Sequence, residues 1–323
     1  MPARSIFHRR HLCTAALAVA TLAAFTHTLP AAAAELTPFK VAMVSSIDTM
    51  PYFYAAQQGY YKELGLDVTL STNDSGPAVV TGVLNGTYDA ATAAAFPILI
   101  AISKGADLRV LAGAVVIRPN TGNSSLVVRK DSPIKGYKDL EGKAVATNAL
   151  TSLTVLATKI GVKAAGGDGN RVKFLALPFK TASQSVAQGQ ADAAVVINPF
   201  GVEAEQAGMK IIADPIGTQL PAGAPYQILF TAAKTAQGKA AQFQAFEKAT
   251  QRAIEQLKAD PQLQRKLAVS LVGYSAEVAK AVTLPEYTTA RIDPGAFQKY
   301  ADLVAEYGYS AKPVEVAKVT ITP

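Results

Sequence analysis

The chain has 323 residues, of which half are hydrophobic and 17% are charged, with 31 Lys and Arg against 24 Asp and Glu. All three histidines and the single cysteine lie before residue 30, so the remaining chain has no imidazole base, thiolate nucleophile, disulfide or zinc site of the usual ligands. These absences exclude most familiar catalytic sites. The sequence therefore predicts a protein without catalytic activity, metal or cofactor.

The charge balance also limits the partners. The first 34 residues carry three of the basic residues and no acid, so residues 35–323 have a formal net charge of 28 − 24, or +4. Neither a block of Lys and Arg nor interleaved basic and aromatic residues is present, so nucleic acid is not an expected partner. The mild positive field favours anionic solutes.

The first 34 residues have the pattern of a secretory signal peptide. Three arginines come before an acid-free apolar run over residues 12–29, and alanines occupy positions 31–34. The apolar run is shorter than the ~20 residues that a membrane-spanning helix needs. We expect cleavage after Ala34, which releases a mature protein into the periplasm.

Two other features of this segment bear on export. A lipid anchor is not expected, because Cys13 lies at the start of the apolar run rather than after it. The pair Arg9-Arg10 leaves the general secretory route and the twin-arginine route both open.

Short β-branched runs alternate with apolar helical stretches along the first third of the mature chain, which is α/β patterning. Proline suits the first turn of a helix because its missing N–H has no partner to lose there. The predicted strands are 39–44, 66–70, 88–91 and 108–116, and the predicted helices open at Pro51, Pro77 and Pro97. Strands that alternate with helices predict a mostly parallel sheet.

A short internal repeat suggests two similar halves. Lys40-Val-Ala is matched by Lys143-Ala-Val, and Gly86-x-x-Asp89-Ala-Ala by Gly189-x-x-Asp192-Ala-Ala, both at an offset of 103 residues. We predict two α/β lobes with a ligand cleft between them. One large doubly wound domain is the alternative.

The last part of the chain is expected to be helical after one more strand over residues 226–232. Asp260-Pro261 and Asp293-Pro294 have the pattern of an N-cap followed by a first-turn proline. The segments 120–125 and 222–227 are predicted to be the hinge between the lobes. The predicted division is 35–123 for the first part of lobe 1, 124–227 for lobe 2, and 228–323 for the return to lobe 1 with the C-terminal helices.

Five collinear motifs carry a resemblance to a known family. They are PYFYAAQQGYYKELGL at 51–66, LNGTYDA at 84–90, SLVVRKDSPI at 125–134, DLEGKAVA at 139–146 and GQADAA at 189–194. The chain resembles the type II periplasmic solute-binding proteins of ABC importers, in the nitrate, sulfonate, taurine and thiamine-precursor-binding group.

The resemblance implies a two-lobed α/β fold, a small-molecule solute, a membrane permease with its ATPase as partners, and a monomer. Relatives that form the thiamine precursor work with histidine and a cysteine cluster. The mature chain has neither, which argues against such an enzyme.

In open α/β sheets, ligands bind beyond the carboxyl ends of the strands, so the loops that follow the strands supply the candidate site residues. Small residues after the third strand would let backbone N–H groups approach the solute. The candidates in lobe 1 are Ser45, Asp48, Tyr52, Ala94, Ala95 and Phe96. Helix capping is the alternative role for Ser45 and Asp48, and core packing is the alternative for Tyr52 and Phe96.

Lobe 2 offers a loop at 146–152 that follows a strand and opens a helix, whose free N–H groups and positive dipole end favour an anionic head group. Capping of that helix is a compatible role for its hydroxyls. The candidates in lobe 2 are Asn148, Thr151, Ser152, Asn198 and Phe200, with Phe179 as a further candidate.

Three residues bear on the charge of the solute. Arg118 could pair with a carboxylate or sulfonate, or remain a solvated hinge residue. Asn198 stands where some relatives carry an acid, which weakens the case for a cationic ligand. Asp48 favours a solute with a donor group, such as an amine or a hydroxyl.

The leading hypothesis is capture of a small organic anion, sulfonate-like or aromatic carboxylate-like, for delivery to a permease. A ligand-sensing receptor domain, a binder of a pyrimidine or amine, and a lyase on the same fold are the alternatives.

Overall fold

The computed structural model describes residues 35–44, 46–73, 75–119 and 124–321. The predicted signal peptide and the candidate Ser45 lie outside the described residues. Within the described ranges, no helix combines the length and the apolar composition needed to cross a membrane.

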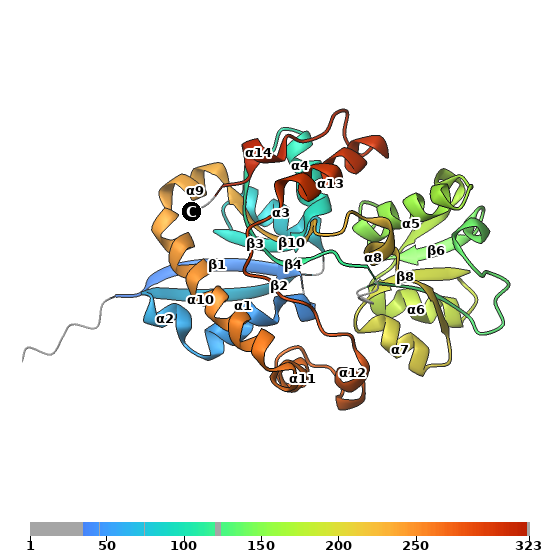
Figure 1. Cartoon of the computed structure of the whole chain (residues 1–323), viewed down its shortest axis with the longest axis horizontal. Helices are drawn as coiled ribbons and strands as arrows, with labels where there is room; N and C mark the ends of the chain where they lie inside the picture. The colour runs from blue at the N-terminus through green and yellow to red at the C-terminus, as the bar shows by residue number, and fades with distance from the viewer. Residues whose placement is uncertain (1–34, 45, 74, 120–123, 322–323) are drawn as a thin grey trace, which may run out of the picture. The chain divides into compact units, whose positions relative to one another are not determined.

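The first sheet has five strands in the order β2-β1-β3-β10-β4 (Figure 1). Strand β1 is parallel to β2 and β3, whereas β10 is antiparallel to β3 and β4. The strands are β1 (Thr37–Val44), β2 (Leu66–Asn73), β3 (Ala90–Ala94), β4 (Leu108–Val116) and β10 (Pro225–Ala232). Strand β10 therefore joins this sheet only after the chain has formed the strands of the second sheet.

The second sheet repeats this arrangement with the order β7-β6-β8-β5-β9. Strand β6 is parallel to β7 and β8, and β5 is the antiparallel strand between β8 and β9. The strands are β5 (Ser124–Val128), β6 (Ala144–Thr147), β7 (Lys173–Ala176), β8 (Ala193–Ile197) and β9 (Lys210–Ala213). The sheets are therefore mixed, each with one strand antiparallel to the other four. Two separate sheets confirm the two-lobed α/β fold and replace the alternative of one doubly wound domain.

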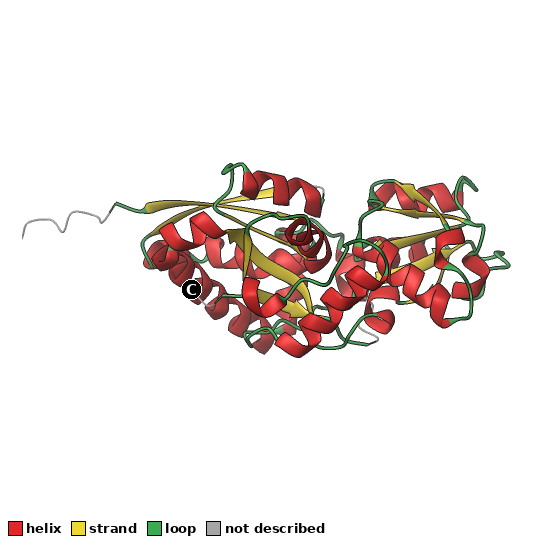
Figure 2. Ribbon diagram, turned by 90° about the horizontal axis from the view of Figure 1, so that it is seen from above, coloured by secondary structure: helices red, strands yellow, loops and turns green. Residues whose placement is uncertain are grey.

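Helices flank the strands of both sheets (Figure 2). Those that precede the second sheet are α1 (Met50–Gln57), α2 (Tyr60–Glu63), α3 (Gly76–Leu84) and α4 (Ala95–Ser103). Those of the second lobe are α5 (Leu153–Ala164), α6 (Phe179–Ala187), α7 (Phe200–Gln206) and α8 (Pro215–Gln219). Those that follow β10 are α9 (Ala233–Gly238), α10 (Ala240–Ala259), α11 (Pro261–Ser270), α12 (Ala276–Ala281), α13 (Pro294–Glu306) and α14 (Val316–Val319).

The proline signals locate the helix starts to within two residues. Pro51 and Pro77 lie in the first turns of α1 and α3, but α4 begins at Ala95, two residues before Pro97. Asp260 and Asp293 cap α11 and α13 as predicted, because each side chain accepts hydrogen bonds from two backbone N–H groups of its helix.

The predicted repeat is present in the structure with one correction to its register. The Oδ2 atom of Asp89 accepts a hydrogen bond from the backbone N–H of Lys40 at 2.8 Å, and that of Asp192 accepts from Ala144 at 2.8 Å. The structural counterpart of Lys40 is therefore Ala144 rather than Lys143. Each aspartate ties the entry of one strand to its parallel neighbour.

An aromatic cluster joins β1, α1 and α2 to α10. Phe246 stacks with Tyr61 at 4.8 Å and with Tyr52 at 5.9 Å between ring centroids, and Phe39 meets Phe243 edge to face at 5.2 Å. All five side chains are buried, and burying each one contributes roughly 1.5–3 kcal/mol. This packing holds α10 against the first sheet.

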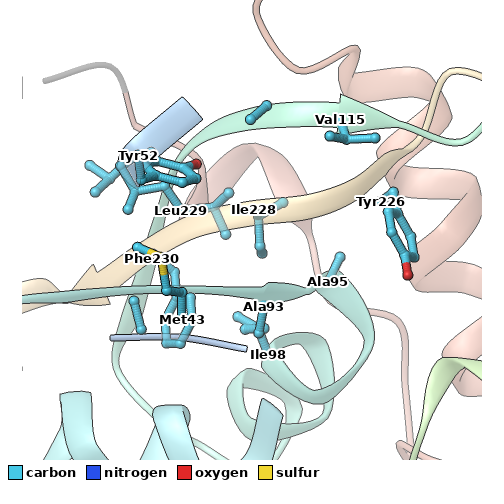
Figure 3. Packing of buried hydrophobic residues seen from close by; sticks show 14 of the residues in the cluster. Met43, Tyr52, Ala93, Ala95, Ile98, Val115, Tyr226, Ile228, Leu229 and Phe230 are labelled. Atoms are coloured by element: carbon cyan, nitrogen blue, oxygen red, sulfur yellow. The ribbon is translucent and has the colours of Figure 1, made fainter. Parts of the chain in front are cut away.

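Side chains of β10 complete the core of the same sheet. Ile228, Leu229 and Phe230 are all at most 3% exposed, and they pack with residues of the neighbouring strands (Figure 3). The chain leaves the first sheet after β4 and re-enters it at Pro225. The predicted division instead places residues 225–227 in the second lobe.

Candidate ligand-binding site

A pocket lies where strands of the two sheets end. Its lining from the first sheet and its helices consists of Val44, Ser46, Gly76, Pro77, Ala94, Pro97, Tyr226 and Gln227. Its lining from the second sheet and its helices consists of Asn148, Ala149, Thr151, Ser152, Leu153, Thr154, Phe179, Ile197 and Ile216.

The sheet topology explains why these distant residues meet. Val44 and Ala94 end β1 and β3, Ile197 ends β8, and the loop from Asn148 follows β6. These are the carboxyl ends of parallel strands, where open α/β sheets bind ligands. Because β10 is antiparallel, its beginning reaches the same edge, and Gln227 lies opposite Ala94 in the register.

The first residues of four helices also line the pocket. They are Gly76 and Pro77 of α3, the N-cap Ala94 of α4, Leu153 and Thr154 of α5, and Phe179 of α6. Each helix has at least nine residues. The N-terminus of a helix carries a positive partial charge and N–H groups without a partner inside the helix.

A cluster of hydroxyls surrounds the start of α5. The Oγ atom of Ser152 lies 2.6 Å from the Oγ1 atom of Thr154, which also hydrogen-bonds to Thr147. Ser152 is the N-cap residue of α5, but its side chain accepts no hydrogen bond from the helix backbone. These hydroxyls can therefore turn toward a solute without loss of a cap.

The opposite wall contains a short chain of buried polar groups. Ser46 Oγ donates to Asp48 Oδ2 at 3.2 Å, and Gln227 Nε2 donates to Ser46 Oγ at 3.2 Å. The three residues are at most 6% exposed, and neither Asp48 Oδ1 nor Gln227 Oε1 has a hydrogen-bond partner among the described residues. Burial raises the pKa of Asp48 to about 6, against the opposing effect of the Ser46 hydrogen bond.

No Lys, Arg, Asp or Glu is among the described residues that line the pocket. Arg118 does not line it, and its Nε atom instead forms an ion pair with Glu286 at 2.7 Å, with both side chains about half exposed. The solute therefore meets backbone, hydroxyl, amide and apolar groups.

The structure brings some of the candidate residues together and separates others. Those that line the pocket are Ala94, Asn148, Thr151, Ser152 and Phe179. Asp48 does not line the pocket itself. Its side chain lies behind Ser46, which does line the pocket and donates a hydrogen bond to it.

The other candidates lie in or near the core. Ala95 and Phe96 are fully buried, and Phe96 packs edge to face against Tyr309 at 4.9 Å. Asn198 is 6% exposed and its Nδ2 atom has no hydrogen-bond partner among the residues that the structure describes, while Phe200 packs against Phe179 with 5.9 Å between ring centroids. None of these four lines the pocket.

Tyr52 contributes to a different cavity, with a volume of about 910 Å³, between the first sheet and α10. Glu247, half-buried in the same cavity wall, has its pKa raised by burial. This cavity lies away from the strand ends that form the pocket between the sheets.

Sequence reasoning missed several lining residues, chiefly Ser46, Thr154, Tyr226 and Gln227. Ser46 lies inside a predicted site loop, between the candidates Ser45 and Asp48, but was not chosen from it. Thr154 lies two residues beyond the predicted loop at 146–152, so a short extension of that loop would have found it. Tyr226 and Gln227 begin an antiparallel strand, and only the topology reveals that this end of β10 faces the pocket.

Across the described chain, no group of three or more His, Cys, Asp or Glu side chains is placed to hold a metal ion.

Solved structures share this fold over most of their length. The alkanesulfonate-binding protein SsuA of Xanthomonas axonopodis pv. citri, bound to MOPS, has a TM-score of 0.76 and 20% identity, covering 90% of this chain and 100% of its own. The periplasmic nitrate-binding protein NrtA of Synechocystis PCC 6803 has a TM-score of 0.73 and 15% identity, covering 88% and 86%. The desulfurization enzyme DSZB has a TM-score of 0.63 and 13% identity, covering 88% and 96%. At these identities the likeness shows the fold.

No curated protein matches the chain in sequence. The family model described as NMT1/THI5 like matches residues 46–263, which is more than half of the chain. The match covers the second sheet, the strands of the first sheet other than β1, and the described pocket lining except Val44. The resemblance expected from the sequence motifs is confirmed at this level, and the chain belongs to the NMT1/THI5-like family.

Proposed function

We propose that the chain is the extracytoplasmic solute-binding component of an ABC importer, which captures a small organic anion between its two lobes and delivers it to a membrane permease. In this proposal residues 1–34 are a cleaved signal peptide and residues 35–323 work as a periplasmic monomer. Family membership and the fold shared with SsuA and NrtA support the solute-binding role.

One observation carries the choice of an anion: the starts of four helices line one pocket that has no acidic side chain among its described lining residues. Each helix start contributes roughly half a positive charge. The hydroxyls of Thr151 and Ser152 add hydrogen-bond donors beside α5. A sulfonate or an aromatic carboxylate fits such a set of donors.

Capture works through lobe closure. A solute that contacts the loops of both sheets stabilises the conformation in which those loops are close, so binding shifts the population toward the closed form. The chain crosses between the sheets twice, after β4 and before β10, and two crossing segments can serve as a hinge. The permease then recognises the closed form.

The enzyme DSZB has a similar fold, so the chemistry of the pocket has to separate binding from catalysis. The side chains that line the pocket are aliphatic, hydroxyl, amide and aromatic. Tyr226 is the one titratable side chain among these described lining residues, and burial raises its pKa well above the ordinary value. Tyr226 is therefore protonated at neutral pH, which supports a binding role.

A thermal-shift screen of residues 35–323 tests the proposal. Sulfonates, nitrate, aromatic carboxylates, amines and pyrimidines are added singly at millimolar concentration, since ligand at 1,000 times its Kd stabilises by about 4 kcal/mol. A rise in Tm with a sulfonate or carboxylate, recovered chemically unchanged, is the expected result. A rise only with amines or neutral pyrimidines would refute the anion, and conversion of the solute would refute the binding role.

A further inference from the structure

The wall formed by Ser46, Asp48 and Gln227 is a directed chain of hydrogen bonds. An ionised carboxylate only accepts hydrogen bonds, and a serine hydroxyl has a single proton to donate. Ser46 gives that proton to Asp48, so its oxygen can only accept from Gln227. The Nε2 atom of Gln227 supplies this bond, which turns the amide oxygen away from Ser46.

Two amide oxygens of the pocket lining have no hydrogen-bond partner in the part of the chain that the structure describes. Among the described lining residues, the buried side-chain atoms that lack a hydrogen bond are Gln227 Oε1 and Asn148 Oδ1. Both are acceptors, and Gln227 is 5% exposed. A buried acceptor without a partner is destabilising until a donor reaches it. A solute that carries an N–H or O–H group could supply the missing donor to these oxygens.

We infer that Asp48, acting through Ser46, holds the Gln227 amide with its Oε1 atom available to the solute, so that the site selects anions that also carry an N–H or O–H donor. The inference rests on the proposed function and narrows its substrate class. Amino- and hydroxy-sulfonates, and aromatic carboxylates with an amino or hydroxyl substituent, have the required chemistry. Asp48 and Ser46 are positioning residues, whereas Gln227 contacts the solute.

The loop that carries the first two members of the chain is itself held in place. Thr49 Oγ1 donates to the backbone oxygen of Ser46 at 2.7 Å, and the Tyr287 hydroxyl donates to that of Ile47 at 2.8 Å. Because both bonds are buried, Ser46 is positioned before any solute arrives.

The titratable groups that face Asp48 are tyrosines from four parts of the chain. They are Tyr52 of α1, Tyr226 of β10, and Tyr274 and Tyr287 on either side of α12. Burial raises the pKa of each, and the charge of Asp48 adds to the effect. All four stay protonated near neutral pH, so Asp48 is the member of this group that titrates there, with a pKa of about 6.

Size-matched pairs of probes test the inference by calorimetry on residues 35–323. One pair is 2-aminoethanesulfonate and propanesulfonate, with 2-hydroxyethanesulfonate to separate hydrogen bonding from charge. The other pair is 4-aminobenzoate and 4-methylbenzoate. In at least one set, we expect the donor-bearing members to bind about tenfold more tightly than the methyl member.

Variants at Ser46 show whether the preference depends on the chain of hydrogen bonds. Ser46→Ala should reduce the preference to about twofold or less, because the Gln227 amide is then free to rotate. Ser46→Thr keeps the hydroxyl and should restore the preference. A Tm within the range of the unmodified protein shows that each variant is folded.

The pH profile of the sulfonate pair supplies a readout that a structural role would not move, since neither the sulfonate nor the amine titrates between about pH 5 and 7.5. The preference should fall as Asp48 becomes protonated, and Asp48→Asn should abolish this pH dependence. Equal binding of all members of each set, or a preference that survives in Ser46→Ala, overturns the inference and leaves the anion site intact. Failure of every probe to bind refutes the anion site and the inference with it.

Discussion

Ile117 is hydrogen-bonded to the segment Gly223–Ala224 through both of its backbone polar groups. Its N–H donates to the carbonyl of Ala224 at 2.8 Å, and its carbonyl accepts from the N–H of Gly223 at 2.8 Å. Ile117 follows β4 and Gly223 precedes β10, so these bonds join the two segments by which the chain crosses between its sheets. A hinge built on paired backbone can bend while its ends stay in register.

Gly223 has a φ of +81°, a conformation that an L side chain adopts only with strain. A Cβ atom there would meet Ala296 at an ordinary 3.9 Å, so the cost of Gly223→Ala is in the backbone. We expect the free energy of unfolding to fall by about 1 kcal/mol in urea titrations. Gly238→Ala is the control, because that helix-end glycine has nothing within 4 Å and no positive φ. Equal stability of the two variants would contradict the strain at Gly223.

The two aspartates of the internal repeat should differ in their contribution to stability. Asp89 also forms an ion pair with Lys239 Nζ at 2.8 Å, whereas Asp192 forms no ion pair with any described residue. We expect Asp89→Ala to lower the free energy of unfolding by about 2 kcal/mol and Asp192→Ala by about 1 kcal/mol. Asp89→Asn keeps the acceptor for Lys40 and should lie between them. Equal losses for Asp89→Ala and Asp192→Ala in chemical denaturation would show that the ion pair contributes nothing.

The fold was predictable because its signals are local. The alternation of apolar runs placed the strand at 108–116 with the bounds of β4, and the Asp-Pro pairs marked the starts of α11 and α13. Periodicity says less about which way a single side chain points. Tyr52 and Phe96 open helices beside the pocket, yet both rings turn into the core, since an aromatic residue in a first helical turn can face either side.

The sequence predicted only those site residues that come directly after a parallel strand in the chain. Asn148, Thr151 and Ser152 were found because they follow a parallel strand. Gln227 lies near the start of an antiparallel strand. A search limited to the loops that follow each strand therefore misses it. The pairing of Gln227 with Ser46 joins residues 181 positions apart, and one sequence alone contains no signal for that contact.

Ser152 and Ser275 are both N-cap residues, and the structure predicts opposite effects for their substitution. The side chain of Ser152 caps no backbone group, whereas Ser275 Oγ accepts from the N–H of Val278 at 3.1 Å. We expect Ser152→Ala to weaken binding of the solute about tenfold with a small change in Tm. Ser275→Ala should leave affinity unchanged and cost about 1 kcal/mol of stability. Calorimetry and thermal unfolding of both variants measure the two effects, and full affinity in Ser152→Ala would remove that hydroxyl from the site.

Asp48 should make the unliganded protein less stable as pH rises. Its pKa is about 6 in the folded protein, against an ordinary value of 3.8 for an exposed aspartate, so between these values the folded state binds more protons than the unfolded state. Stability contributed by the protonated form is therefore present below about pH 4 and lost as pH rises through 6, by on the order of 3 kcal/mol. Asp48→Asn carries no charge at any pH, so its Tm should exceed that of the unmodified protein at about pH 7.5 and converge with it at about pH 4. The difference in Tm between the two proteins, followed from about pH 4 to 8, isolates Asp48 from all other titrating groups. A difference that does not change with pH would mean that Asp48 is paired or hydrated in solution, and that it cannot direct the hydrogen bonds of Ser46.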